Sequence, residues 1–284
     1  ADAEKAVNAY NTLKDNGMKV FIGTVTTGAC LSVVSQTKAD NMFQITPSAS
    51  AAKVIANDNC FQVCFTDPNQ GTASADYIAS KGLATKVAVI YNSSDAYSSG
   101  IYDNFKAEAA AKGLDLVASE AFTGDSKQDF SSQLSKIKAS GAELIFLPIY
   151  YQEASLILSQ AKNAGITAKF FGCDGLDGLL NIENFDKSLA ENVMLLTPFA
   201  ANATDETTKK FVAAYNAKYD PSTLNQFAAD AYDAVYIVKA AAEKAGVTGD
   251  MSVSDICNAL KGAMTEITVD GVTGSGMTWK ATGE

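Results

Sequence analysis

Short apolar segments recur along much of the chain, and most of them are apolar at every position rather than at alternate positions. Runs of this kind are typical of strands that are covered on both faces, as in a parallel sheet. The clearest examples are residues 87–91 and 144–149. Strands are also predicted at residues 19–23, 42–46, 169–172 and 193–197.

Between these strands, apolar residues recur every three or four positions, a spacing that places them on one face of an α-helix. Residues 152–164 show this pattern, and Gly165 follows them as a helix stop. Further helices are predicted at residues 2–14 and 128–139. Strands that alternate with helices predict parallel sheets joined by right-handed crossovers, which is the doubly wound α/β class.

The pattern changes after residue 203, where three successive helices are predicted at residues 205–219, 226–245 and 253–263. Residues 267–280 are rich in β-formers and glycine, and we expect a hairpin there. The chain contains no low-complexity tract and no long linker of Pro, Gly or Ser. We therefore expect two lobes joined by short crossings, which suits a length of 284 residues.

The charged residues narrow the range of functions. Acidic residues number 32 against 22 basic ones, which gives a net charge of −10 at pH 7. Every basic residue is Lys, because the sequence contains neither Arg nor His. The net charge repels nucleic acid, and no Arg is present to read guanine or clamp a phosphate. The lack of His excludes Ser-His-Asp and Cys-His catalysis and any His-ligated metal site.

Hydropathy gives no sign of a membrane anchor within this sequence. No apolar run approaches the roughly 20 residues that a membrane-spanning helix needs. The chain begins without Met and without a basic and then apolar signal segment, so we expect that a targeting peptide has been removed or was not included.

The five Cys residues are too few for a disulfide scaffold, and their number is odd. Cys60 and Cys64 flank a predicted strand, and four residues of strand span about 13 Å, which is too far for a disulfide between them. We expect buried thiols or one distant pair, with a redox or metal role as the alternative.

Two hydroxyl-rich loops follow the first two predicted strands. Residues 23–29 contain two glycines but lack the Lys-Ser/Thr of a phosphate loop, and no G-x-G-x-x-G follows a strand, so we expect no nucleotide cofactor. The Thr hydroxyls and N–H groups of this loop suit a carboxylate, with simple helix capping as the alternative. A second such loop at residues 46–51 favours an anion site, because ligands of doubly wound sheets bind at the carboxyl ends of the strands.

Three further loops follow later strands. Residues 91–100 present Tyr97 ahead of a helix, and residues 148–151 place paired tyrosines at a strand end, where packing at a lobe edge is the alternative. Asp174 lies between glycines after another apolar strand, in what is otherwise a surface turn. Together the five loops offer donors for a carboxylate, one carboxylate for an ammonium group, and aromatic walls. This set is complementary to a free amino acid.

Three motifs carry a resemblance to a known family: ITPSAS at residues 45–50, CFTDPNQG at residues 64–71, and QFAADAYDA at residues 226–234. The chain resembles the branched-chain-amino-acid (leucine/isoleucine/valine) class of ABC-transporter substrate-binding proteins, which are type I periplasmic binding proteins. The resemblance covers essentially the whole chain in order. It implies two doubly wound lobes with parallel sheets that close on a ligand like a Venus flytrap.

The resemblance also implies roles for individual residues. Thr27, with Thr26 beside it, matches the position that holds the ligand carboxylate, and Asp174 matches the acidic residue that pairs with the ammonium group. Family members commonly have Glu there, so the shorter Asp implies a ligand that sits deeper or is smaller. The ligand-binding residues implied are Thr26, Thr27, Ser48, Ser50, Tyr97, Tyr150 and Asp174.

The same resemblance implies how the lobes are assembled. Lobe one is expected at residues 1–66 and 198–266, and lobe two at residues 67–197 and 267–284, with hinge crossings near Asp67, Pro198 and Ile267. Relative to the family, the chain is expected to lack the first strand-helix-strand and the last strands. A sheet without its first strand is expected to have an exposed edge.

The function implied is that of an extracytoplasmic solute-binding protein, periplasmic or a cell-surface lipoprotein, which captures a free amino acid between its lobes. Its partner is then the membrane permease of an ABC importer, and neither a cofactor, a metal nor an enzymatic activity is expected. One alternative is a sensory ligand-binding domain, since receptors use the same fold. A hydrolase or transferase is a weaker alternative, because the sequence has no G-x-S-x-G elbow and no His base.

Overall fold

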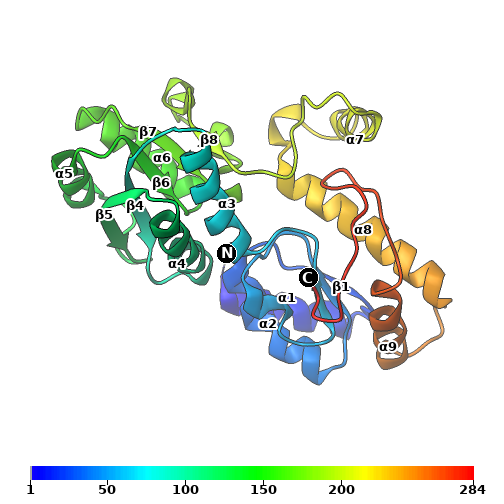
Figure 1. The fold of residues 1–284 in the computed structure, drawn as a ribbon. Coiled ribbons are helices and arrows are strands. Elements are labelled where there is room, and N and C mark those ends of the chain that lie inside the picture. Colours follow the sequence, from blue (N-terminus) through cyan, green and yellow to red (C-terminus); the bar gives the residue numbers. More distant parts are fainter. Residues whose placement is uncertain (1) are drawn as a thin grey trace. The chain divides into compact units, whose positions relative to one another are not determined.

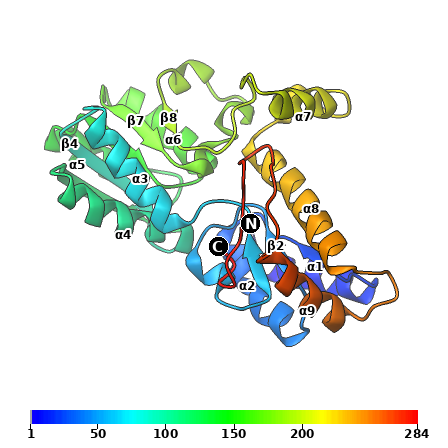
Figure 2. The same cartoon turned by 45° about the vertical axis from the view of Figure 1, so that its right-hand side comes forward.

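The computed structural model describes residues 2–284. The chain divides into two compact units: Ala1–Thr66 with Pro198–Glu284 form the first, and Asp67–Thr197 form the second. Each unit contains its own β-sheet with helices packed against it (Figures 1 and 2). Both sheets are parallel throughout, so the α/β class with parallel sheets is confirmed.

The sheet of the first unit has three short strands, which are β1 (Phe21–Ile22), β2 (Gln44–Thr46) and β3 (Cys60–Gln62) in that spatial order. All residues of β2 and β3 are buried, including the polar Gln44, Thr46 and Gln62. Because the three strands run in the same direction, the loops after β1 and β2 meet at one edge of the sheet.

Five α-helices belong to the first unit: α1 (Ala3–Asp15), α2 (Thr27–Ala39), α7 (Glu206–Asn216), α8 (Gln226–Ala245) and α9 (Val253–Met264). Phe43 and Phe61 of the sheet region pack in one buried cluster with Ile237 of α8 and Leu260 of α9. Four of these helices begin at an Asp, Asn or Ser whose side chain accepts a backbone N–H of the first turn. The first unit also contains the short 3₁₀-helices η1 (Ala52–Ile55) and η5 (Pro221–Thr223).

The sheet of the second unit has five strands, which are β4 (Lys86–Asn92), β5 (Asp115–Phe122), β6 (Leu144–Leu147), β7 (Lys169–Gly172) and β8 (Met194–Leu195). Their spatial order is β5-β4-β6-β7-β8. The chain therefore moves outward from β4 in one direction to β5 and in the other direction to β6. This reversal between β4 and β6 is the place at which a doubly wound sheet binds its ligand.

Helices cover both faces of this sheet. The helices α3 (Asp67–Ser80) and α4 (Ala96–Ala111) bury one apolar cluster, and α5 (Ser131–Ser140) and α6 (Tyr151–Asn163) bury another. Gly71 allows α3 to approach α4 closely, because a Cβ there would lie 2.5 Å from the carbonyl oxygen of Ile101. Three 3₁₀-helices follow β7: η2 (Asp174–Leu176), η3 (Leu179–Asn181) and η4 (Lys187–Ala190).

The expected place of residues 267–284 in the second lobe is wrong, because this tail belongs to the first unit. The indole N–H of Trp279 donates to the carbonyl oxygen of Gln62 at 2.8 Å, and the N–H of Gln62 donates to the carbonyl oxygen of Gly283 at 3.1 Å. These bonds fix the tail on strand β3. The chain consequently passes between the units only after Thr66 and after Thr197, and no crossing exists at Ile267.

The predicted hairpin in the tail is reduced to a single antiparallel bridge between Val269 and Met277. All five Cys residues are buried, and none of them forms a disulfide. Within residues 2–284, no helix combines the length and the apolar character that a membrane span requires.

Candidate functional site

The first group of predicted residues lies where β1 and β2 end. Thr26 is the N-cap residue of α2 and Thr27 is its first residue, whereas Ser48 and Ser50 lie in the loop after β2. Ser48 Oγ donates to the carbonyl oxygen of Val25 at 2.7 Å, and the N–H of Ser50 donates to Thr27 Oγ1 at 3.2 Å. These two hydrogen bonds bring the four predicted residues of the first unit together.

Two of these hydroxyl groups are buried and unused. In residues 2–284, neither Thr26 Oγ1 nor Ser50 Oγ has a hydrogen-bond partner, and both atoms are shielded from solvent. Thr26 makes no side-chain capping bond to α2 either, which argues against helix capping as its role. A buried hydroxyl without a partner costs free energy, and a polar group of a ligand would remove that cost. The first N–H groups of α2 add donors for an anion at the same place.

The second group of predicted residues lies at the reversal of strand order in the second unit. Tyr97 is in the first turn of α4, after β4, and Tyr150 is the N-cap residue of α6, after β6. Their rings stack with a centroid separation of 4.7 Å and an interplanar angle of 18°. Tyr97 is buried, so it packs inside its unit and does not lie at an exposed edge.

Asp174 follows β7 and is joined to this aromatic pair. Its side chain is buried, and the Tyr97 hydroxyl donates to Asp174 Oδ1 at 2.5 Å. Burial raises the pKa of Asp174 to about 6, whereas hydrogen bonds from Tyr97, Gln70 and the backbone of Gly175 act in the opposite direction. Asp174 is therefore a carboxylate whose charge is costly in the folded protein and is favoured by any bound cation.

Gly175 is required for this arrangement. A Cβ at this position would lie 2.6 Å from the carbonyl oxygen of Ile149 and 2.7 Å from the Tyr97 hydroxyl. With glycine there, the N–H of Gly175 donates to the Tyr97 hydroxyl at 2.9 Å. The loop between β7 and η2 thus depends on glycine for its close approach to α4.

The structure places the seven predicted residues in two sets, one in each unit. Sequence reasoning did not single out Gln70 of α3, which is fully buried and accepts the N–H of Asp174 at 3.3 Å. Its only signal in the sequence is its place in the motif CFTDPNQG. In the described part of the chain, no cluster of Cys, Asp and Glu suits a metal ion.

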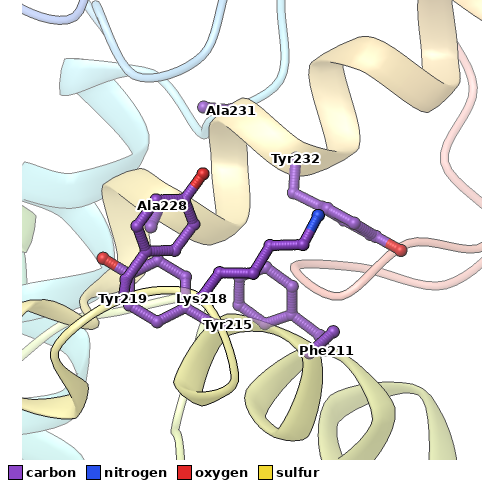
Figure 3. A pocket seen from close by; sticks show the side chains of 8 residues that line it. Phe211, Tyr215, Lys218, Tyr219, Ala228, Ala231 and Tyr232 are labelled. Atoms are coloured by element: carbon purple, nitrogen blue, oxygen red, sulfur yellow. The ribbon is translucent and has the colours of Figure 1, made fainter.

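A separate cavity of about 460 Å³ lies between α7 and α8 of the first unit (Figure 3). Its lining residues are Phe211, Ala214, Tyr215, Lys218, Tyr219, Ala228, Ala231 and Tyr232. Lys218 is the one charged residue among them, and no carboxylate lines the cavity. This cavity consequently lacks the paired opposite charges that a free amino acid requires, and it contains none of the predicted site residues.

Comparison with known proteins adds independent findings. The family model described as "Periplasmic binding protein" matches residues 1–284. Leu/Ile/Val-binding protein homolog 3 of Brucella melitensis is 32% identical over 252 residues, which cover 88% of this chain and 67% of that protein. The leucine-, isoleucine-, valine-, threonine-, and alanine-binding protein of Pseudomonas aeruginosa is 28% identical over 261 residues, or 91% of this chain and 68% of that protein.

Solved structures show the same similarity. The branched-chain amino acid transporter substrate binding protein LivJ of Streptococcus pneumoniae, in complex with isoleucine, matches with a TM-score of 0.84 at 26% identity, covering 100% of this chain and 78% of that chain. The leucine binding protein LivK of Thermotoga maritima matches with a TM-score of 0.83 at 24% identity, covering 100% of this chain and 79% of that one. At that lower identity, the match shows a common fold.

Proposed function

The chain belongs to the periplasmic binding protein family, and we propose on this basis that it captures a free amino acid, branched-chain or similar, for import into the cell. Membership of this family implies a solute-binding role and an extracytoplasmic location. The names of the similar proteins from Brucella and Pseudomonas, and the isoleucine in the pneumococcal structure, support a branched-chain ligand.

The observation that carries the proposal is the buried carboxylate of Asp174. Burial raises the pKa of this group to about 6, so the ionised form of Asp174 is stabilised when a cation binds to it. The α-ammonium group of an amino acid is such a cation. Because the chain has no Arg, its partner for the ligand carboxylate is a set of neutral donors, which Thr26, Thr27 and the N-terminus of α2 supply.

The two sets of residues are proposed to bind one ligand molecule. Thr26 and Thr27 bind its carboxylate, and Asp174 binds its ammonium group together with the hydroxyl of Ser50 and the carbonyl of Ser48. Tyr97 and Tyr150 form an aromatic wall. The buried hydroxyls of Thr26 and Ser50, which have no partner in residues 2–284, support their assignment to the ligand.

The finer features of the proposal follow from this role. The units Asp67–Thr197 and Ala1–Thr66 with Pro198–Glu284 serve as the two lobes, and the loaded protein is recognised by the membrane permease of an ABC importer. The ligand is released unaltered, since the task is capture and presentation. The proposed location is the periplasm, or the cell surface if the protein is a lipoprotein.

A thermal-shift screen of the individual L-amino acids tests this function directly. A ligand at a hundredfold excess over its Kd stabilises the folded state by about 2.7 kcal/mol, so a true ligand raises the melting temperature clearly. We expect leucine, isoleucine or valine to do so, and mass spectrometry to recover the bound amino acid unmodified. The proposal is wrong if no amino acid shifts the melting temperature, or if the ligand is converted steadily into a product.

A further inference from the structure

Three hydrogen bonds hold Asp174 within the unit Asp67–Thr197: the Tyr97 hydroxyl donates to its carboxylate, the Gln70 side chain accepts its backbone N–H, and the Gly175 N–H donates to the Tyr97 hydroxyl. These three residues come from three different parts of that unit, which are α4, α3 and the loop after β7. The roles assigned to the ligand-binding residues leave Gln70 and the Tyr97 hydroxyl unexplained. Both side chains are buried, so their polar groups depend on the protein for hydrogen bonds.

The direction of the hydrogen bonds at Tyr97 is fixed by chemistry. A backbone N–H can only donate, so the Tyr97 oxygen accepts the N–H of Gly175 at 2.9 Å. The single hydroxyl hydrogen is then directed to Asp174 Oδ1 at 2.5 Å. Because the ring stacks on Tyr150 at 4.7 Å, the hydroxyl cannot move without disturbing the core.

Gln70 restrains the backbone of Asp174, whereas Tyr97 contacts its carboxylate. The Oε1 of Gln70 accepts the N–H of Asp174 at 3.3 Å, which fixes the backbone where the side chain begins. Its Nε2 is buried. The next residue, Gly71, lies against the backbone of α4, so Gln70 and Tyr97 are held on one tightly packed pair of helices.

We infer that Tyr97 and Gln70 are positioning residues, which act on the ligand through Asp174 by fixing the orientation and the ionised state of its carboxylate. The inference rests on the proposed function, because it assumes that Asp174 pairs with the ligand ammonium group. It adds that the hydroxyl of Tyr97 serves the carboxylate and not the ligand.

The groups around Asp174 predict how its titration depends on Tyr97. Asp177 and Cys173 lie in the same loop, Tyr97 and Tyr150 face it from α4 and α6, and Asp67 of α3 faces Cys173. Burial and the charge of Asp177 raise the pKa of Asp174, and the hydrogen bonds of Tyr97, Gln70 and Gly175 lower it. Loss of the Tyr97 hydroxyl therefore raises this pKa further and reduces the ionised fraction at neutral pH.

The first test needs no ligand. The ¹³Cγ chemical shift of Asp174 is followed by NMR against pH in the wild type, in Tyr97→Phe and in the control Tyr102→Phe. Tyr102 is a suitable control because it lies on the same helix and its ring also stacks, on Tyr91 at 3.9 Å. We expect the midpoint to rise by about one pH unit in Tyr97→Phe and to stay in place in the control. An unchanged midpoint in Tyr97→Phe overturns the inference.

The second test is a double-mutant cycle with L-isoleucine as the probe in calorimetric titrations. We expect Tyr97→Phe to weaken binding about tenfold when Asp174 is present, and less than about twofold in the Asp174→Asn background. Gln70→Met is expected to show the same dependence on Asp174. Equal losses in both backgrounds mean that the hydroxyl contacts the ligand itself, and they overturn the inference.

These tests separate the inference from the proposed function. A wild type that binds none of isoleucine, leucine and valine contradicts the proposed function, whereas the NMR titration still decides whether Tyr97 controls the carboxyl group. A variant that has lost its fold is recognised by its circular dichroism. In that case Tyr97→Phe is examined at lower temperature against Tyr102→Phe, and equal titrations of Asp174 in the two variants count against the inference.

Discussion

The hydroxyl oxygen of Thr27 accepts the backbone N–H of Ser50 at 3.2 Å, and both residues are buried. This bond joins the first residue of α2 to the loop after β2, so one side chain orders both candidate loops of the first unit. The proposed acceptor for the hydroxyl hydrogen of Thr27 is the ligand carboxylate. Thr27 is therefore expected to affect both stability and binding.

Replacement of Thr27 by Val tests this double role. Val keeps the shape of the side chain but leaves the buried N–H of Ser50 without an acceptor, which is expected to lower the free energy of unfolding by about 1–3 kcal/mol. Binding of the amino acid is expected to weaken by about 1.5–3 kcal/mol, because the group it contacts is charged. Urea denaturation and calorimetry measure the two effects. Thr27→Ser keeps the hydroxyl oxygen and is the control. If Thr27→Val has the stability and the affinity of the wild type, the hydroxyl of Thr27 has neither role and the residue only begins α2.

Replacing Ser50 or Ser48 by Ala is expected to have different effects on stability. Ser50 Oγ is buried without a partner in residues 2–284, so Ser50→Ala is expected to leave stability unchanged or slightly higher while binding weakens by about 1.5–3 kcal/mol. Ser48 Oγ donates to Val25, so Ser48→Ala is expected to lower stability by about 1 kcal/mol. Thermal melts with and without ligand distinguish the two. Full affinity in Ser50→Ala would remove its hydroxyl from the site.

Asp174→Asn is expected to raise the stability of the free protein and to lower its affinity for the ligand. Burial raises the pKa of Asp174 from its ordinary value of 3.8 to about 6 in the folded chain, so the folded state binds this proton more tightly than the unfolded state. Stability is therefore lost as pH rises from about 4 to about 6, by about 3 kcal/mol in total. Asn carries no such charge and is expected to stabilise the free protein at pH 7, whereas affinity falls by about 2–5 kcal/mol.

Denaturation at pH 7 measures the stabilisation, and calorimetry measures the affinity. Asp129→Asn is a useful control, because hydrogen bonds with Ser131 lower the pKa of Asp129 and its loss is expected to act in the opposite direction. A less stable Asp174→Asn protein at pH 7 would show that burial is not the main influence on this carboxyl group.

The pH dependence of binding follows from the same carboxyl group. A ligand ammonium favours the ionised form of Asp174, so affinity is expected to fall as pH is lowered from 7 through about 6. Binding near pH 6 is then accompanied by proton release, which appears in calorimetry as a heat that depends on the ionisation enthalpy of the buffer. Asp174→Asn is expected to bind weakly and without this dependence. A wild-type affinity that is constant from pH 7 to pH 5 would exclude Asp174 as the ammonium partner.

Gly271 is expected to be essential to the attachment of the tail. A Cβ there would lie 2.4 Å from Asp233 Oδ2, and Asp233 accepts the N–H groups of Val272 and Thr273 at 2.9 and 2.8 Å. Gly271→Ala displaces this buried carboxylate and is expected to cost about 2–4 kcal/mol of stability. Gly262→Ala, in an open position of α9, is the control and is expected to stabilise by about 0.5–1 kcal/mol. Equal melting temperatures for the two variants would contradict this account.

Sequence patterns predicted the elements that are buried on both faces. All residues of β6 (Leu144–Leu147) are buried, and such a strand is apolar at every position. The edge strand β5 was missed because most of its side chains are partly exposed and its hydropathy is mixed. Helix α3 was missed because it packs through Gly71 and small residues, so it has no broad apolar face.

The loops of the candidate site were predictable because parallel strands present their carboxyl ends at one edge. Gln70 was not, since its role arises from a hydrogen bond to a residue 104 positions away, which no local pattern encodes. The tail was misplaced for the same reason. A hairpin pattern predicts how residues 267–280 pair with one another, whereas the bond from Trp279 to Gln62 decides which sheet they join.

The second unit, Asp67–Thr197, is one uninterrupted stretch of chain, whereas the first unit is assembled from two. Gln70, Tyr97, Tyr150 and Asp174 all fall inside the uninterrupted stretch. A single recombination event that replaces the corresponding stretch of gene therefore transfers Asp174 together with Gln70 and Tyr97, whose hydrogen bonds hold it. Thr26, Thr27, Ser48 and Ser50 are encoded outside that stretch, so the two sets of candidate site residues can change independently in evolution.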